Sequence, residues 1–152
     1  MRSEVLDSMV VENEADMDFG DIIPGATNGT VVMTPSGSPL CTPNNGIIRT
    51  GTCRAARFDG DVSFFFFLRV TRPAGNQITL TGPNGATMQL TNFTYDMATA
   101  SWNLGLQGND QRYVILTGNG NFTLYVGGTL NVASNQRPGV YNGSFALTFN
   151  YD

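Results

Sequence analysis

Hydrophobic and polar residues alternate in short runs along the chain, and the clearest run stands at its C-terminal end. From Tyr141 to Asp152 the sequence reads YNGSFALTFNYD. A β-strand places successive side chains on opposite faces, so one face of this segment is apolar and the other polar. The apolar face carries Phe145, Leu147, Phe149 and Tyr151. The pattern predicts a half-buried strand whose exposed edge is covered by an earlier strand or by another molecule.

Similar runs cover the rest of the chain, separated by Gly, Asn and Pro, and no long segment has the 3.6-residue period of a helix. The strands are expected at residues 4–11, 16–19, 29–34, 63–71, 77–82, 87–95, 112–117, 121–132 and 143–151. Short strands at this spacing predict an all-β fold, in the form of a two-sheet sandwich.

A run of phenylalanines at residues 64–67 interrupts this alternation. A continuous apolar run is typical of a central strand that is buried on both faces. It also fits an exposed aromatic face that contacts a neighbouring surface. The pattern leaves both alternatives open.

The length of 152 residues suits one domain with a single core. We expect residues 13–152 to form this domain, with residues 1–12 as an N-terminal extension or a first strand. Only 13% of the residues are charged, the net charge is -4, and every basic residue is Arg. This composition is typical of a secreted β-protein, and it argues against binding to nucleic acid and against membrane insertion.

Cys41 and Cys53 are the two cysteines of the chain. Two cysteines without a histidine do not make a zinc site, so the sequence favours a disulfide between them over free thiols. Closing this loop would stabilise the fold by about 3 kcal/mol in the chain-entropy model. A disulfide indicates an oxidising compartment, yet no apolar signal sequence follows Met1. We therefore expect residue 1 to begin a processed or trimmed form of the protein.

Side chains for catalysis are scarce, because His and Lys are absent and only carboxylates, hydroxyls and Arg remain. The acidic spacing at residues 59–61, Asp-Gly-Asp, lacks the further oxygen ligands of a calcium loop, so a solvated turn is expected there. We expect no enzymatic activity, no cofactor and no metal.

Two motifs near the ends of the chain resemble those of a known family. Residues 17–25, MDFGDIIPG, look like the L-D-F-G-x-I-x-P-G opening of a family of small secreted bacterial domains of unknown function, and residues 29–35, GTVVMTP, follow as in that family. Residues 126–132, VGGTLNV, resemble its closing G-G-x-L-x-V motif. The closing pattern continues downstream at Gln136, Gly139, Tyr141, Gly143 and Phe145.

That family is similar to the spore coat protein U domain and to pilins of the archaic chaperone-usher class. The resemblance implies an incomplete immunoglobulin-like sandwich, completed in a filament by the N-terminal extension of the next subunit. The implied partners are identical subunits, a periplasmic chaperone and an outer-membrane usher. The implied acceptor groove lies at the last strand, with Phe145, Leu147, Phe149 and Tyr151 in it.

The candidate donor strand precedes the opening motif. Val5, Met9 and Val11 share one face of an extended segment, although Asp7 interrupts it, and Leu6 lies on the other face. The same segment could be the first strand of its own sandwich, and the pattern does not decide between the two roles.

We therefore expect a structural subunit of a bacterial surface filament, exported through the periplasm and assembled noncovalently by donor-strand exchange. The alternative is a monomeric secreted binding module, such as a sugar-binding adhesin or a coat protein. Trp102 and Tyr95 would then be candidates for stacking on a sugar ring.

Overall fold

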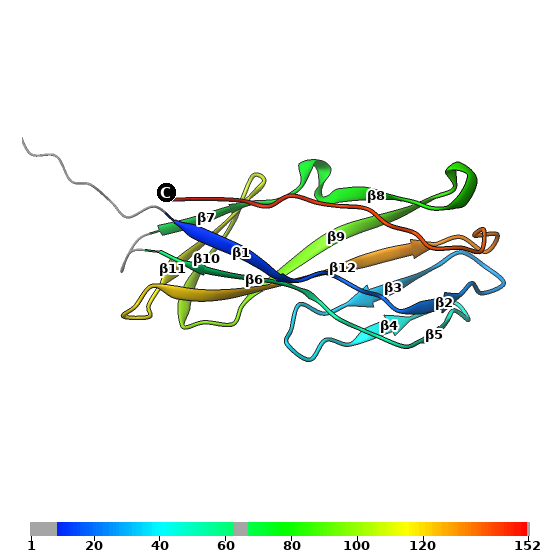
Figure 1. Cartoon of the computed structure of the whole chain (residues 1–152), viewed down its shortest axis with the longest axis horizontal. Coiled ribbons are helices and arrows are strands. Elements are labelled where there is room, and N and C mark those ends of the chain that lie inside the picture. Colours follow the sequence, from blue (N-terminus) through cyan, green and yellow to red (C-terminus); the bar gives the residue numbers. More distant parts are fainter. Residues whose placement is uncertain (1–8, 63–66, 152) are drawn as a thin grey trace, which may run out of the picture.

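The computed structural model describes residues 9–62 and 67–151. Within these residues the strands form a seven-stranded sheet, a four-stranded sheet and a two-stranded ribbon (Figure 1). Two single-turn 3-10 helices, η1 (Ala74–Asn76) and η2 (Pro83–Gly85), stand at the two ends of one edge strand. The predicted all-β sandwich is confirmed.

The large sheet is arranged around one long strand, β12. Its strands are β1 (Val10–Ala15), β3 (Gly29–Met33), β4 (Cys41–Pro43), β6 (Ala56–Asp61), β8 (Gln77–Thr81), β9 (Thr87–Met97) and β12 (Asn121–Val132). One edge of β12 pairs with β6 along its first half and with β3 along its second half, while the other edge pairs with β9. β1, β4 and β8 lie outside β6, β3 and β9, respectively.

The smaller sheet has the strand order β10-β11-β7-β13. Its strands are β7 (Phe67–Thr71), β10 (Ser101–Gln107), β11 (Asp110–Ile115) and β13 (Thr148–Tyr151). The ribbon joins β2 (Asp21–Ile23) to β5 (Ile48–Thr50). All these pairings are antiparallel, so the sheets need only short connections.

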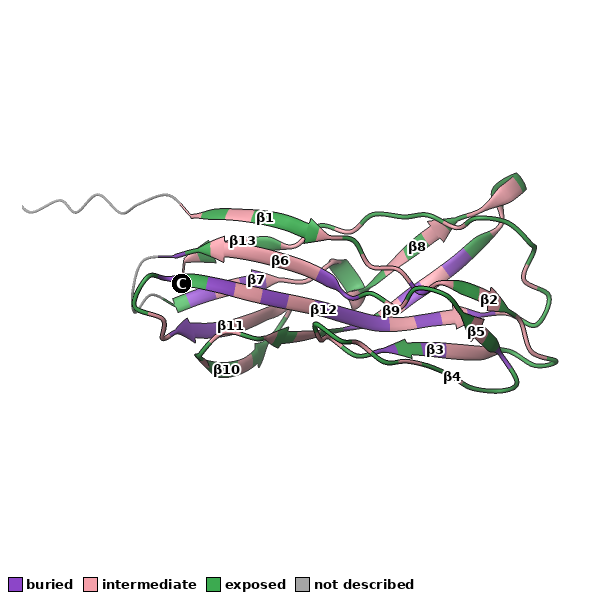
Figure 2. Cartoon of the chain, turned by 60° about the horizontal axis from the view of Figure 1, so that its bottom comes forward, coloured by how far each residue is buried: buried purple, intermediate pink, exposed green. Residues whose placement is uncertain are grey.

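The core lies between the two sheets (Figure 2). The large sheet contributes alternate residues of β12, and the smaller sheet contributes alternate residues of β7 and the last three residues of β11. The fully buried members include Leu124, Val126, Leu68, Val70 and Ile115. Burying each of these side chains stabilises the fold by about 1.5 to 3 kcal/mol, which is why a period of two defines the strands.

β6 is a strand that the pattern did not predict, and the expected turn at residues 59–61 is wrong. Asp59 accepts hydrogen bonds from Arg57 and from the Thr123 hydroxyl, at 2.8 Å for the closest Arg57 nitrogen, so its charge is compensated within the sheet. A Cβ on Gly60 would collide with the ring of Phe122. Charged residues and a glycine are typical of a turn, whereas here Arg57 and Asp59 form an ion pair within one strand, and Gly60 leaves room for an aromatic ring from the neighbouring strand.

β10 is another strand that the pattern missed, as are the short strands β2, β4 and β5, and its large side chains do not alternate in burial. Trp102, Leu104 and Leu106 are all exposed, and the register shifts by one residue between Asn103 and Gly105. A bulge of this kind moves side chains off the regular alternation and protects an edge strand from further pairing.

The phenylalanine run lies mostly outside the described residues, which resume at Phe67. In the register of the smaller sheet, Phe67 stands beside Val114, and Val114 stands beside Trp102. Phe67 and Trp102 are exposed, whereas Leu68, the next residue, is completely buried. The described part of the run therefore has one buried and one exposed face.

The terminal strands differ in extent from those predicted. The described part of the first strand runs from Val10 to Ala15 and shares only its first two residues with the expected 4–11, of which residues 4–8 lie outside the described residues. The strand expected at 16–19 is reduced to one bridge between Asp18 and Arg54. At the other end, β13 covers only the last part of 143–151. The predicted alternation is nevertheless present from residue 144 to 151, with the aromatic and leucine side chains half-buried and their neighbours exposed.

Candidate functional site: a cleft between the first and last segments

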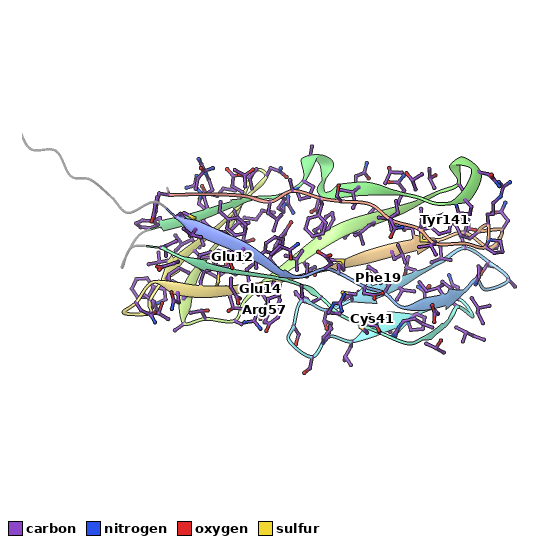
Figure 3. All side chains as sticks on the ribbon, viewed as in Figure 1. Glu12, Glu14, Phe19, Cys41, Arg57 and Tyr141 are labelled. Atoms are coloured by element: carbon purple, nitrogen blue, oxygen red, sulfur yellow. A yellow bond between two sulfur atoms is a disulfide. The ribbon has the colours of Figure 1, made fainter. Side chains whose placement is uncertain are left out.

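Two segments from opposite ends of the sequence border one side of the sandwich. Residues 16–24 follow β1, and residues 136–145 lead toward β13. Figure 1 shows them as a blue and an orange-red trace, and Figure 3 labels Phe19 on the first and Tyr141 on the second. We call residues 16–24 the first wall and residues 136–145 the second wall.

A cleft of about 1110 Å³ separates the two walls. Its floor consists of apolar side chains that alternate along three neighbouring strands of the large sheet. These are Ile78 and Leu80 of β8, Met88 and Leu90 of β9, and Leu130 and Val132 of β12. Phe19 and Ile22 contribute from the first wall and Phe145 from the second. The cleft is therefore a long apolar groove bordered by extended backbone.

The first wall is held by its opening motif. Phe19 is buried, and the Asp18 carboxylate accepts a hydrogen bond from the Gly20 amide at 2.8 Å. Gly20 has φ +79°, and a Cβ there would collide with the carbonyl oxygens of Thr50 and Thr52. Only glycine combines this dihedral angle with such a close approach of backbone. The motif therefore fastens the first wall to the chain around β5.

The disulfide strengthens the same wall. Cys41 and Cys53 are bonded, with their Cα atoms 6.0 Å apart, so the predicted bridge is confirmed. Arg54, the next residue, exchanges two backbone hydrogen bonds with Asp18 at 2.8 and 2.9 Å. The bridge thus joins β4 to the backbone at residues 53–54, and this backbone pairs with the first wall at Asp18.

Replacing both cysteines by serine is expected to lower the free energy of unfolding by about 3 kcal/mol, because the unfolded chain regains the entropy of a closed loop. Urea unfolding of the oxidised protein and of the Cys41→Ser/Cys53→Ser variant measures this difference. Adding a reductant should destabilise the unmodified protein by a similar amount and leave the variant unchanged. Equal midpoints for the oxidised protein and the variant would contradict a stabilising role.

The second wall is held by its closing motif. The Tyr141 hydroxyl donates a hydrogen bond to the Arg137 carbonyl oxygen at 2.7 Å, and the Tyr141 ring covers Gly82, where a Cβ would collide with it. Asn142 exchanges two backbone hydrogen bonds with Thr81, at 2.8 and 3.0 Å. The contacts of Tyr141 and Asn142 therefore hold the second wall against the end of β8.

Beyond this contact the second wall has no ladder partner among the described residues. Residues 143–147 belong to no strand, and regular pairing resumes only at Thr148 with Thr71 of β7. The first wall is paired on its outer side, at Asp18 and through β2. The groove is thus bordered by extended segments whose facing edges do not pair with each other, which is the arrangement that an added strand requires.

The four predicted acceptor residues separate into two places. Phe145 lines the cleft and packs on Phe93, with ring centroids 4.9 Å apart. Phe149 does not line the cleft and packs on Phe58 and Phe122, with ring centroids 5.8 and 6.0 Å apart, while Phe58 also contacts Phe145 at 6.4 Å. Leu147 and Tyr151 are also half-buried against the core and do not line the cleft. The structure therefore brings one of the four to the cleft.

The floor residues are functional candidates that the sequence analysis did not single out. Their apolar positions alternate within the expected strands at 77–82, 87–95 and 121–132, so each was counted as ordinary core. Nothing in the alternation distinguishes a side chain covered by the opposite sheet from one that faces a groove.

The predicted donor residues lie at or before the start of β1. Val5 and Leu6 are outside the described residues. Met9 and Val11 are half-buried against the core of their own chain, and Val10 is 58% exposed. Because β1 pairs with β6, residues from Val10 onward act as an intrachain strand in this structure.

The two aromatic residues considered for sugar stacking are on different sheets. Trp102 is 57% exposed on β10 of the smaller sheet. Tyr95 belongs to β9 of the large sheet and packs against the core, and burial raises the pKa of its hydroxyl. The structure does not combine them into one sugar platform.

A second pocket of about 450 Å³ adjoins the cleft and shares Met88, Val132 and Gln136 with it. Carboxamides dominate its lining: Asn28, Asn44, Asn45, Gln89, Asn131 and Gln136. Several are fixed by the backbone; for example, the Asn44 side-chain oxygen accepts a hydrogen bond from the Thr30 amide at 2.7 Å. The pocket offers uncharged donors and acceptors in fixed positions.

Asp59 and Tyr113 are ionisable groups of the described residues whose surroundings shift their pKa. The hydrogen bond from Arg57 lowers the pKa of Asp59, an effect that partial burial opposes, and burial raises the pKa of Tyr113 to about 12. Within the described ranges, no group of three or more His, Cys, Asp or Glu residues is placed to hold a metal ion. In the same part of the chain, no helix has the length and apolarity needed to cross a membrane.

Comparison with known proteins agrees with the opening and closing motifs. One family model, described as "Domain of unknown function (DUF4402)", matches residues 9–151 and therefore includes both walls and the floor of the cleft. No curated protein and no solved structure matches the chain. Because the family model spans almost the whole sequence, the chain belongs to the DUF4402 family.

Proposed function

We propose that this protein is a structural subunit of a bacterial extracellular filament, assembled noncovalently by donor-strand exchange and without enzymatic activity. The observation that carries the proposal is the apolar cleft between the first and the last segments of the sandwich. A β-strand from another molecule fits such a groove, since main-chain hydrogen bonds hold the strand while alternate side chains enter the apolar floor.

An inserted strand would gain about 1.5 to 3 kcal/mol for each apolar side chain that it buries, before the cost of ordering the strand. The floor residues Ile78 and Leu80 are only half-buried in the isolated subunit, and open strand edges and apolar side chains attract other chains. A filament in which every cleft is filled covers these side chains.

The fold also suits a head-to-tail arrangement. β1 begins at the end of the molecule formed by β7 and β11, whereas the cleft lies in the other half, beside β2 and β8 (Figure 1). Nine residues precede β1, and in extended form they would reach about 30 Å. We assign the donor role to the segment that precedes Met9, with Val5 and Leu6 as the apolar side chains, while Met9 and Val11 stay in their own sandwich.

The implied partners follow from this assignment. Identical subunits occupy each other's clefts, and a heterologous contact of this kind produces an open filament rather than a closed ring. Before assembly, a periplasmic chaperone would cover the cleft and an outer-membrane usher would exchange it for the donor strand. The resemblance to spore coat protein U and to archaic chaperone-usher pilins supports these partners and the cell-surface location.

A denaturing gel of surface-extracted protein, with and without boiling, tests the proposal. We expect a ladder of subunit multiples without boiling and the 16.4 kDa monomer after boiling, because an inserted strand is released only when the sandwich unfolds. Disulfides should be left intact in both samples, so that the difference reports only noncovalent contacts. A single monomer band in both lanes would contradict strand exchange.

A single monomer band in both lanes would favour the alternative function, a monomeric secreted binding module. The observation in favour of this candidate is the carboxamide-lined pocket, because neutral donors and acceptors in fixed positions are suited to the hydroxyl groups of a neutral sugar. In a filament the pocket would border the filled cleft, since the two cavities share lining residues.

A further inference from the structure

The carboxamide-lined pocket forms where three segments that are distant in the sequence meet. Asn28 precedes β3, Asn44 and Asn45 lie in the turn between β4 and β5, and Asn131 belongs to β12. Side-chain hydrogen bonds join these segments: the Asn45 Nδ2 donates to the Asn28 carbonyl oxygen at 2.8 Å, and the Asn28 Oδ1 accepts from the Ser134 amide at 2.9 Å. The pocket is therefore held together by its own lining residues.

Two asparagines leave hydrogen-bond donors in the pocket. The Asn44 Oδ1 accepts a hydrogen bond from the Thr30 amide at 2.7 Å, and the Asn28 Oδ1 is occupied by the Ser134 amide. Because only the oxygen of a carboxamide accepts from a backbone N–H, these bonds leave both Nδ2 groups over. Neither Nδ2 group has a partner among the described residues. Gly29 makes room for this arrangement, since a Cβ there would lie 2.8 Å from the Asn44 Oδ1.

Two further asparagines leave acceptors in the pocket. The Asn45 Nδ2 donates to the Asn28 carbonyl oxygen, and the Asn131 Nδ2 donates to the Gln89 carbonyl oxygen at 3.2 Å. Within the part of the chain that the structure describes, the Oδ1 atoms of Asn45 and Asn131 have no partner. The pocket thus presents two donors and two acceptors, each fixed by a bond from the other end of the same carboxamide to the backbone.

The remaining lining limits the chemistry of a ligand. No charged side chain stands among the described residues that line the pocket, and Met88, Val132 and Ala133 add apolar surface. An ionic ligand would therefore meet no opposite charge, and an apolar ligand would leave the four polar groups unpaired. A hydroxyl group both donates and accepts. A ligand with several neutral hydroxyl groups and apolar C–H surface fits this lining.

We infer that the carboxamide-lined pocket binds a neutral saccharide. The Nδ2 groups of Asn28 and Asn44 donate to its hydroxyl oxygens, and the Oδ1 atoms of Asn45 and Asn131 accept from its hydroxyl groups. All of these residues belong to the sandwich itself, so the site does not depend on donor-strand exchange and is present in every subunit of a filament as well as in a single chain. Along a filament, many weak sites would act together on one polysaccharide.

Asn44→Asp and Asn28→Asp test the two donors. Each new carboxylate still accepts from the Thr30 or the Ser134 amide, so the fold is retained, but the free Nδ2 donor becomes a charged acceptor. Saturation-transfer NMR of the full chain with methyl glycosides of glucose, galactose, mannose and fucose measures binding, and it applies to single subunits and to filaments. We expect binding of at least one glycoside, and roughly tenfold weaker binding by each variant.

Asn119→Asp is the matched control. The Asn119 Oδ1 also accepts from a backbone amide, that of Asn121 at 3.1 Å, but the residue lies in the loop before β12 and does not line the pocket. The control therefore makes the same chemical change and adds the same charge outside the pocket. It should bind the glycoside as the unmodified protein does. An equal loss in Asn119→Asp would reduce the effect to net charge and overturn the assignment.

The other outcomes are equally decisive. If the protein binds none of the glycosides, the saccharide site is wrong. If a glycoside binds but Asn44→Asp and Asn28→Asp bind it unchanged, the saccharide occupies another surface and the pocket assignment fails. If the charged methyl glucuronide binds more tightly than the methyl glucoside, the neutral class is wrong. None of these results changes the ladder expected on the unboiled gel, so the filament proposal is decided separately.

Discussion

Removing residues 1–9 is expected to abolish filament formation while leaving the sandwich folded. The deletion ends one residue before β1, so the pairing of β1 with β6 and the half-buried Val11 remain. The truncated chain keeps its cleft but has no strand to insert into the next subunit. Electron microscopy and the unboiled gel should show no multimers, and circular dichroism should retain the β-sheet spectrum.

Mixing the truncated chain with the full-length chain sharpens this experiment. A truncated subunit can receive a donor strand but cannot supply one, so it should terminate filaments, and their mean length should fall as its proportion rises. A full-length variant with Val5→Ser and Leu6→Ser is the matched control. It keeps the chain length but has no apolar side chains at these two donor positions, so it should also terminate filaments. Normal filaments from the truncated chain alone would refute the donor assignment.

Placing a charge on the floor of the cleft is expected to have an equally large effect. Ile78 lines the cleft from the edge strand β8 and is only half-buried, so Ile78→Asp should be tolerated by the fold of the isolated subunit. An inserted strand would cover the new carboxylate and remove it from water without a partner, at a cost of several kcal/mol. We expect Ile78→Asp to lose assembly, as measured by the unboiled gel, with a change in subunit stability of about 1 kcal/mol or less.

Thr79→Asp is the control for this substitution, because Thr79 is exposed and its hydroxyl is hydrogen-bonded to Gln89 on the other face of β8. It adds the same charge one residue away and should assemble normally. If both variants assembled, the floor of the cleft would not be the binding surface. If neither assembled, the effect would come from charge on β8 rather than from the cleft.

The two sequence motifs of the family have a common structural explanation. In the opening motif, Phe19 and Gly20 seat the first wall against the chain around β5; in the closing motif, Tyr141 seats the second wall on Gly82. These parts of the two motifs therefore hold the borders of the cleft, while Leu130 and Val132 of the closing motif lie on its floor. The floor needs only apolar side chains of suitable size, so its residue types vary among Ile, Leu, Met and Val.

Much of the sandwich follows from the sequence, because a strand with one buried face must alternate. The segment 121–132 has a strict period of two, and the structure confirms β12 over the same residues. The disulfide follows from the absence of other cysteines and of histidine, since no competing pairing or metal site exists. The apolar face of residues 144–151 was also correct, because the period of two identifies a face without reference to any other strand.

Only the tertiary structure decided which residues pack against the apolar face of each strand. Phe145 and Phe149 lie four residues apart on one face, yet the first lines the cleft and the second packs on Phe58 and Phe122. Strand β6 escaped prediction because its charges and glycine are satisfied by neighbours distant in sequence, such as Thr123 and Phe122. Alternation is a local property of the chain, whereas an open groove exists only because two distant segments border the same sheet without pairing.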